Sequence, residues 1–153
     1  MSHEEVSIPK GLMVVGVDGS PTSLAALRWA AANAPLLNMS IEAICAWDNI
    51  SFATDLLAVG FGSSGVVDTT DAESIAKRIV ESAAAEIFTV ARPLDLQLNT
   101  YEGGATEVFL EKSKSAQMLV LGSRGHGAIA DLFLGSVSNN CSAKAKCPVL
   151  VVH

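Results

Sequence analysis

Five short apolar runs recur along the chain, and segments with helical features separate them. The runs cover 12–17, 41–47, 94–101, 118–121 and 149–152. The first and last runs are unbroken and rich in valine and leucine, which is typical of strands buried on both faces of a parallel sheet. The run 94–101 begins with alternating apolar and polar residues, as a more exposed strand does. Strands that alternate with helices predict an α/β fold with a doubly wound parallel sheet.

The predicted helices carry recognisable start signals. Ser20 followed by Pro21 fits an N-cap with proline at the first helical position. Thr70 and Glu73 have the spacing of a capping box for the second helix. Two further helices are predicted over 105–115 and 136–144. The apolar positions expected to face the core are Leu24, Leu27 and Ala31 in the first helix, and Ile75, Ile79, Ala83 and Ile87 in the second.

These elements predict a single domain over 11–153, preceded by a flexible tail over 1–10. A length of 153 residues fits one domain. The tail has no basic segment followed by an apolar one, so it does not resemble a secretory signal. The segment 48–69 contains several glycines and is long for a connection, which predicts either a lid or an unstructured excursion.

Composition and charge exclude several classes of protein. Hydrophobic residues make up 50% of the chain and charged residues 17%, which suits a packed core. A net charge of −6 argues against binding to nucleic acid, and no apolar run is long enough to cross a membrane. Cys45, Cys141 and Cys147 form no CxxC pair, which favours a reduced, cytoplasmic protein with buried thiols.

Glycines and hydroxyl side chains cluster after the fourth predicted strand. Gly122, Gly125 and Gly127 follow this strand, and Gly135 and Ser136 open the last helix. Glycines let backbone N–H groups approach an anion, and the N-terminus of a helix favours phosphate. The sequence therefore predicts a two-sided phosphate cradle. The alternative is that the glycines only make turns and that Ser136 only caps a helix.

This cradle differs from two better-known phosphate loops. No Gly-Lys-Ser/Thr closes it, as a Walker A loop requires, and it does not follow the first strand, as a dinucleotide fingerprint would. The first strand leads instead to Asp18, Gly19 and Ser20. Because parallel strands end at the same edge of a sheet, we expect Asp18 and the cradle to converge there.

The chain resembles the universal stress protein family, of the type that binds adenine nucleotides. The family motif is a glycine, two residues, a glycine, nine residues, a glycine, and then Ser or Thr. Here it is matched by Gly122, Gly125, Gly135 and Ser136. The resemblance covers nearly the whole chain, from the signature at the end of the first strand, 15–20, to the signature of the last strand, 147–152. It implies a Rossmann-like three-layer α/β/α sandwich of the adenine nucleotide alpha hydrolase-like type, with a five-stranded parallel sheet in the order 3-2-1-4-5.

The resemblance also implies roles for individual residues. Asp18 would lie near the ribose or a phosphate-bound Mg²⁺, with Gly19 and Ser20 beside it. Ala46 would offer backbone groups to adenine, and Leu121 would pack on the adenosine. The residues expected to hold ribose and phosphates are Gly122, Gly125, Gly135, Ser136, Val137 and Ser138.

Three further side chains are candidates for the pocket, and the family motif assigns no role to any of them. Arg124, inside the glycine loop, is either a nucleotide ligand or a solvated charge. Trp47 is expected to form a wall of the pocket. A catalytic role for His126 would need an orienting partner that the sequence does not offer, so no catalytic residue is predicted.

The sequence thus predicts a cytoplasmic stress-response or regulatory protein that binds ATP with Mg²⁺ and forms a homodimer through the strand 149–152. Two alternatives stay open: a slow ATP hydrolase or phosphotransferase that uses the same pocket, and an interaction module that binds no ATP. The cradle does not distinguish ATP from ADP, AMP or cyclic AMP.

Overall fold

The computed structural model describes residues 8–48, 72–125 and 134–153. Within these ranges helices and strands alternate along the chain, as the sequence predicted. In chain order the elements are β1 (Gly11–Gly16), α1 (Pro21–Asn33), β2 (Met39–Trp47), α3 (Ala72–Ile87), β3 (Gln97–Glu102), α4 (Ala105–Lys112), β4 (Met118–Gly122), α5 (Ser136–Lys144) and β5 (Val149–Val152).

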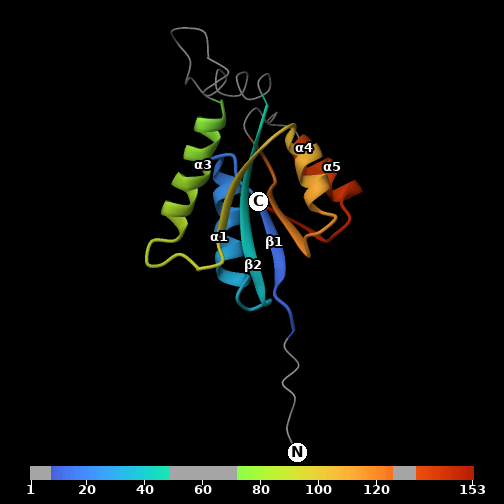
Figure 1. Ribbon diagram of the computed structural model, residues 1–153. Coiled ribbons are helices and arrows are strands. Elements are labelled where there is room, and N and C mark those ends of the chain that lie inside the picture. The colour runs from blue at the N-terminus through green and yellow to red at the C-terminus, as the bar shows by residue number, and fades with distance from the viewer. Residues whose placement is uncertain (1–7, 49–71, 126–133) are drawn as a thin grey trace, which may run out of the picture.

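The strands form one parallel sheet in the order β3-β2-β1-β4-β5. Helices α1 and α3 cover one face of this sheet, and α4 and α5 cover the other (Figure 1). The three-layer sandwich and the strand order that the family resemblance implied are therefore confirmed.

Each face of the sheet has its own hydrophobic core, because successive strand residues point to opposite faces. Val15 of β1 faces α1 and α3, where it joins Leu27 and Val80. Val14 faces the other way and joins Phe109 of α4. All five side chains are at most 4% exposed. Because the central strands are covered on both faces, they need apolar residues at successive positions, which explains their unbroken apolar sequences.

The predicted start of β3 is wrong. The strand begins at Gln97, and Leu94 is fully exposed rather than part of it. The Leu96 N–H donates to the Pro93 carbonyl at 3.1 Å, so a turn occupies this stretch. Helix α4 likewise ends at Lys112, earlier than the predicted Ser115.

The buried face of α3 also differs from the prediction. Ala83 is buried as expected, but Ile75, Ile79 and Ile87 are only half-buried. The buried positions are instead Ala72, Ala76, Val80, Ala83 and Ala84. These side chains are mostly alanine, which lets the helix approach the sheet closely while the longer isoleucines flank the contact.

Several predictions fall outside the described residues. They concern most of the tail over 1–7, the segment 49–69, the cap residue Thr70, and His126 with Gly127 in the glycine loop. Among the helices that are described, none has the length and apolar character needed to span a bilayer.

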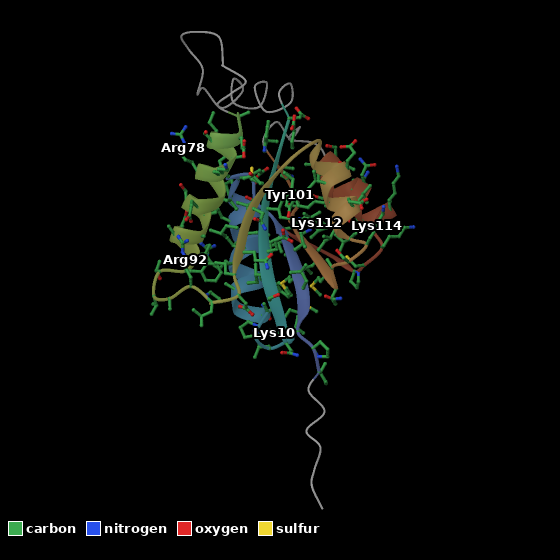
Figure 2. All side chains as sticks on the ribbon, in the orientation of Figure 1. Lys10, Arg78, Arg92, Tyr101, Lys112 and Lys114 are labelled. Carbon is green, nitrogen blue, oxygen red and sulfur yellow. The ribbon has the colours of Figure 1, made fainter. Side chains whose placement is uncertain are left out.

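One carboxylate is buried on the α4 face of the sheet. Glu42 of β2 is 3% exposed. Its Oε1 accepts hydrogen bonds from Asn99 Nδ2 at 2.9 Å, Tyr101 Oη at 2.7 Å and Lys112 Nζ at 3.0 Å. Tyr101 and Lys112 lie beside each other near the middle of the molecule (Figure 2), with the ammonium 4.2 Å from the ring centroid. These four side chains, which we call the Glu42 cluster, join β2, β3 and α4.

The ionisation of the Glu42 cluster follows from its geometry. Burial raises the pKa of Glu42, but the hydrogen bonds from Tyr101, Asn99 and Lys112 outweigh it and hold the pKa below its ordinary value. Burial lowers the pKa of Lys112, but its bonds to Tyr101 and Glu42 outweigh that effect and raise it. The structure therefore favours a charged pair.

Candidate functional site

The candidate site lies at the carboxyl edge of the sheet, where β1 and β4 end and α5 begins. Asp18 follows β1, and the stretch from Ser123 to Gly125 follows β4. A Cβ placed on Gly125 would lie 2.7 Å from Asp18 Oδ2, and one on Gly135 would lie 3.4 Å from the Ser123 carbonyl oxygen. The predicted convergence of Asp18, the glycine loop and the start of α5 is therefore present.

The turn between β1 and α1 fixes the Asp18 carboxylate. Its Oδ1 accepts a hydrogen bond from the Ser20 N–H at 2.9 Å and another from the Ser20 hydroxyl. Gly19 has a φ of +83°, in the left-handed region that favours glycine. Ser20 also caps α1, because its oxygen accepts from the Ser23 N–H. The predicted cap and the predicted position of Asp18 thus belong to one turn.

Thr22 connects this turn to the glycine loop, a role that sequence reasoning missed. Its hydroxyl donates to the Arg124 carbonyl at 2.5 Å and accepts from the Arg124 N–H at 3.3 Å. The Ser20 hydroxyl lies 3.2 Å from the same carbonyl oxygen. The only signal in the sequence is a run of hydroxyl residues around Pro21, which does not reveal a partner about a hundred positions away.

Gly122 and Gly125 serve different purposes in the motif. A Cβ on Gly122 would lie 2.7 Å from the backbone nitrogen of Ser23, so this glycine lets β4 pack closely against α1. Gly125 is exposed, and the atom nearest to its missing Cβ is the carboxylate tip of Asp18. Gly125 is therefore the glycine of the motif at which a side chain would crowd the Asp18 carboxylate.

The N-terminus of α5 is the other side of the site. Gly135 is the N-cap, and its N–H donates to the Ser123 carbonyl at 2.6 Å. A glycine has no side chain with which to cap, and the next three N–H groups of a helix have no partner within it. These are the N–H groups of Ser136, Val137 and Ser138. Together with the helix dipole, they make this end suitable for an anion.

Of the two predicted hydroxyl donors, only Ser136 is exposed. Ser138 is 3% exposed, and its hydroxyl donates to the Gly122 carbonyl at 2.6 Å. This bond joins α5 to the end of β4. Val137 is half-buried and packs against the core beneath α4 and α5.

The remaining predicted residues lie around this edge at different depths. Ala46 and Trp47 are half-buried at the end of β2, and Trp47 packs on the α1–α3 side of the sheet. Leu121 is 3% exposed and belongs to the opposite core, so the side chain lies beneath the site. Arg124 is exposed.

Cys45 is buried close to Asp18 but is not a ligand candidate. Burial, and then the negative charge of Asp18, raise the pKa of the Cys45 thiol to about 12, so the thiol stays protonated. Over the described ranges, no group of three or more His, Cys, Asp or Glu side chains could hold a metal ion. The geometry thus offers backbone donors and the exposed Ser136 hydroxyl for an anion, with one fixed carboxylate beside them.

Comparisons with known proteins agree with this architecture. A model of the universal stress protein family matches residues 12–153. A universal stress protein of Mycobacterium tuberculosis is 34% identical over 141 residues, which cover 92% of this chain and 47% of the relative. A second one from the same species is 31% identical over 149 residues, with the same coverage. This chain thus spans about half the length of the curated relatives it matches.

Solved structures show the same fold at lower identity. A universal stress protein of Lactobacillus plantarum superposes with a TM-score of 0.73 at 19% identity, over 96% of this chain and all of the other. A universal stress protein in complex with cAMP superposes with a TM-score of 0.64 at 24% identity, over 95% of this chain and 98% of the other. The family match covers nearly the whole chain and agrees with the strand order, so the chain belongs to the universal stress protein family.

Proposed function

We propose that this chain binds an adenine nucleotide, ATP with Mg²⁺, and acts as a nucleotide-dependent stress-response or regulatory protein in the cytoplasm. One observation carries the proposal: the uncapped start of α5, the exposed Gly125 and the fixed Asp18 carboxylate meet at one edge of the sheet. The three cysteines, which are free in the structure, support the cytoplasmic location.

Different residues of the site would bind different parts of the nucleotide. The phosphates would lie against the N–H groups of 136–138 and the Ser136 hydroxyl. Asp18 would reach the ribose or a Mg²⁺ held by phosphate oxygens, and Arg124 is free to turn toward the phosphates from an exposed position. The adenine would contact the end of β2 at Ala46, and the adenosine would lie over Leu121.

The ligands of structural relatives support this chemical class. One universal stress protein is in complex with cAMP, and one from Archaeoglobus fulgidus, with a TM-score of 0.63 at 17% identity, is in complex with dAMP. Both are adenine nucleotides with a single phosphate. Backbone donors bind a phosphate group in the same way whether the nucleotide carries one phosphate or three. The choice of ATP over AMP or cyclic AMP is therefore tested by a direct comparison of ligands.

A thermal-shift series tests the proposal. The intact chain is heated with ATP, ADP, AMP, cyclic AMP or GTP, each with Mg²⁺. A ligand at a hundredfold excess over its dissociation constant stabilises the folded state by about 2.7 kcal/mol. We expect ATP to raise the melting temperature more than the other adenylates and much more than GTP. The absence of a shift with every adenylate would reject nucleotide binding.

We expect bound ATP to be hydrolysed far more slowly than the ~10 s⁻¹ typical of enzymes. Phosphoryl transfer needs an aligned nucleophile and cations on the developing charge. Apart from Arg124 and a bound Mg²⁺, the described part of the site offers backbone N–H groups and the Ser136 hydroxyl, which bind ground state and transition state about equally. A phosphate-release assay measures the rate. Turnover at ordinary enzyme rates that disappears in Asp18→Ala would favour the ATP hydrolase instead.

We also propose a homodimer in which β5 pairs with β5 of a second copy. β5 lies at one end of the sheet, and its valine-rich sequence carries no charged side chain. The Ser123 N–H bonds to the Val152 carbonyl, so even-numbered β5 residues face β4 and Val151 directs its backbone groups outward. Val151→Lys should convert the dimer to a 15.9 kDa monomer in light scattering. A wild-type monomer, or an unchanged dimer in the variant, would refute this pairing.

A further inference from the structure

The glycine loop after β4 is held in place by a side chain of α1. At Ser123 the chain is still tied to the sheet, because the Ser123 N–H donates to the Val152 carbonyl at 2.8 Å. At Arg124 both backbone groups bond instead to the Thr22 hydroxyl, the carbonyl at 2.5 Å and the N–H at 3.3 Å. Arg124 is therefore the point at which the loop leaves the sheet and is fixed to the first turn of α1.

A threonine hydroxyl suits this pair of bonds. It donates one hydrogen and accepts through its lone pairs, so a single oxygen satisfies the N–H and the C=O of the same residue. The β-branched side chain of Thr22 is also stiff at χ1, so little entropy is lost when its hydroxyl is fixed. Valine has the same shape and the same stiffness, but it has neither a donor nor an acceptor.

The turn that carries Thr22 is itself fixed from several sides. Pro21 occupies the first position of α1, and the Ser20 carbonyl accepts from the Ser23 hydroxyl at 3.0 Å. The oxygen of the Ser23 hydroxyl accepts in turn from the Asp18 N–H at 3.3 Å. The position of Thr22 is therefore set by α1 and by the turn after β1, and the loop adapts to it.

The first glycine of the family motif brings this hydroxyl within reach of the loop. A Cβ on Gly122 would lie 2.6 Å from Thr22 Oγ1 and 2.7 Å from the Thr22 carbonyl carbon. Any other residue at 122 would push α1 away from the end of β4, and the hydroxyl with it. Gly122 and Thr22 thus depend on each other, although Thr22 lies outside the motif.

The loop that Thr22 fixes lies between the other two parts of the site. A Cβ on Gly125 would lie 2.7 Å from Asp18 Oδ2, and one on Gly135 would lie 3.7 Å from Arg124 Cα. Arg124 and Gly125 are exposed, so burial of their own atoms does not hold them in place. A shift of the Arg124 backbone would therefore move the loop relative to both the carboxylate and the start of α5.

We propose that Thr22 is a positioning residue of the nucleotide site: its hydroxyl fixes the backbone of Arg124 and Gly125 before the ligand arrives. A loop that is already ordered loses little conformational entropy on binding, so the affinity for nucleotide depends on this hydroxyl. The effect on affinity rests on the proposed function, whereas the order of the loop is a property of the free chain.

Thr22→Val tests the proposal against two matched variants. Thr22→Ser keeps the hydroxyl, and Thr106→Val makes the same change at the second position of α4, where the threonine is also half-buried. We expect Thr22→Val to raise the dissociation constant for Mg-ATP at least about tenfold in calorimetric titration. Thr22→Ser should raise it less than about threefold, and Thr106→Val should leave it unchanged.

A second measurement, on the free chain, separates the loop from the ligand. The Arg124 N–H bonds to the Thr22 hydroxyl, so Thr22→Val should speed its amide hydrogen exchange and Thr22→Ser should not. The circular dichroism spectra of the variants should match the wild type, because valine fills the same space as threonine. Thr22→Ala takes the place of Thr22→Val if the latter does not fold.

Two kinds of failure are distinguishable. If the wild type and Thr22→Val bind Mg-ATP equally well, the positioning role is overturned and the nucleotide site stands. A loss of affinity that Thr22→Ser does not restore, or that Thr106→Val shares, would trace the effect to packing and also overturn the role. If the wild type binds no Mg-ATP, the nucleotide site itself is rejected, and exchange at Arg124 still shows whether Thr22 orders the loop.

Discussion

Gly125→Val is expected to raise the dissociation constant for Mg-ATP at least about a hundredfold, a loss of about 2.7 kcal/mol in binding free energy. The new Cβ would lie 2.7 Å from Asp18 Oδ2, and among the described residues no other side chain or backbone group is that close. Only the tip of one side chain has to move, so we expect the fold to be retained. The valine displaces the Asp18 carboxylate and occupies the space where phosphate would meet the loop. Calorimetric titration with Mg-ATP measures the loss.

Ser136→Ala is the matched control for this loss. It removes an exposed hydroxyl at the first turn of α5 but leaves the backbone N–H groups of 136–138 in place. We expect it to weaken binding by less than tenfold, since one neutral hydrogen bond contributes about 1 kcal/mol. If Gly125→Val binds Mg-ATP as tightly as wild type, the nucleotide does not lie between Gly125 and Asp18.

Lys112→Met is expected to destabilise the fold by about 3 kcal/mol, because it leaves a buried carboxylate without its counter-ion. Glu42 is 3% exposed, and Lys112 lies 3.0 Å from its Oε1. For a domain of this size, that loss lowers the melting temperature by about 6–12 °C. Chemical denaturation at neutral pH measures the change in the free energy of unfolding.

The same variant should show a characteristic dependence on pH. In the wild type, folding lowers the pKa of Glu42. The stabilisation of the folded state that Glu42 provides is therefore fully present above about pH 4.3, the ordinary pKa of a glutamate, and it is lost as the pH falls through the lower pKa of the folded state. Folding raises the pKa of Lys112. The stabilisation that Lys112 provides is therefore fully present below about pH 10.4, the ordinary pKa of a lysine, and it is lost as the pH rises through the higher pKa of the folded state. In Lys112→Met, Glu42 is unpaired. The difference in the free energy of unfolding between wild type and variant should therefore be widest near neutral pH, and it should narrow in acid as Glu42 of the variant takes up a proton.

Two controls make this second prediction specific. Lys114→Met breaks an exposed pair with Glu111, in which both side chains are more than 60% exposed, and should cost no more than about 0.5 kcal/mol. Glu42→Gln added to Lys112→Met removes the unpaired charge and should restore part of the lost stability. A Lys112→Met variant as stable as Lys114→Met would mean that the Glu42 cluster contributes no net stability.

The elements of the fold were largely predictable from local pattern, whereas some of their faces and ends were not. The valine-rich runs predicted the bounds of β1 and β5 to within a residue, although β5 is half-buried rather than buried on both faces, and Ser20 with Pro21 predicted the start of α1. The exposed Leu94 misled the prediction of β3, because the sequence does not show whether an apolar residue has a neighbour to pack on. The order of the strands came from the family resemblance, since periodicity contains no information about which strands pair.

The site was predictable where it depends on backbone geometry and not where it depends on distant pairing. The glycine spacing predicted that the loop after β4 meets the start of α5, and the end of β1 predicted that Asp18 lies beside them; the structure shows this convergence. The bonds of Thr22 to Arg124 and of Ser138 to Gly122 were missed, because each depends on how separate segments meet. The Glu42 cluster was missed for the same reason, since its partners lie 57 to 70 positions from Glu42.

Amide hydrogen exchange with and without Mg-ATP tests the central claim most directly, because it locates the ligand as well as detecting it. We expect Mg-ATP to slow exchange at 136–138 at the start of α5 and at Arg124 and Gly125 in the loop. Exchange at the outer edge of β3 should stay unchanged. Slower exchange confined to other parts of the chain, or no change at saturating Mg-ATP, would contradict a nucleotide site at the carboxyl edge of the sheet.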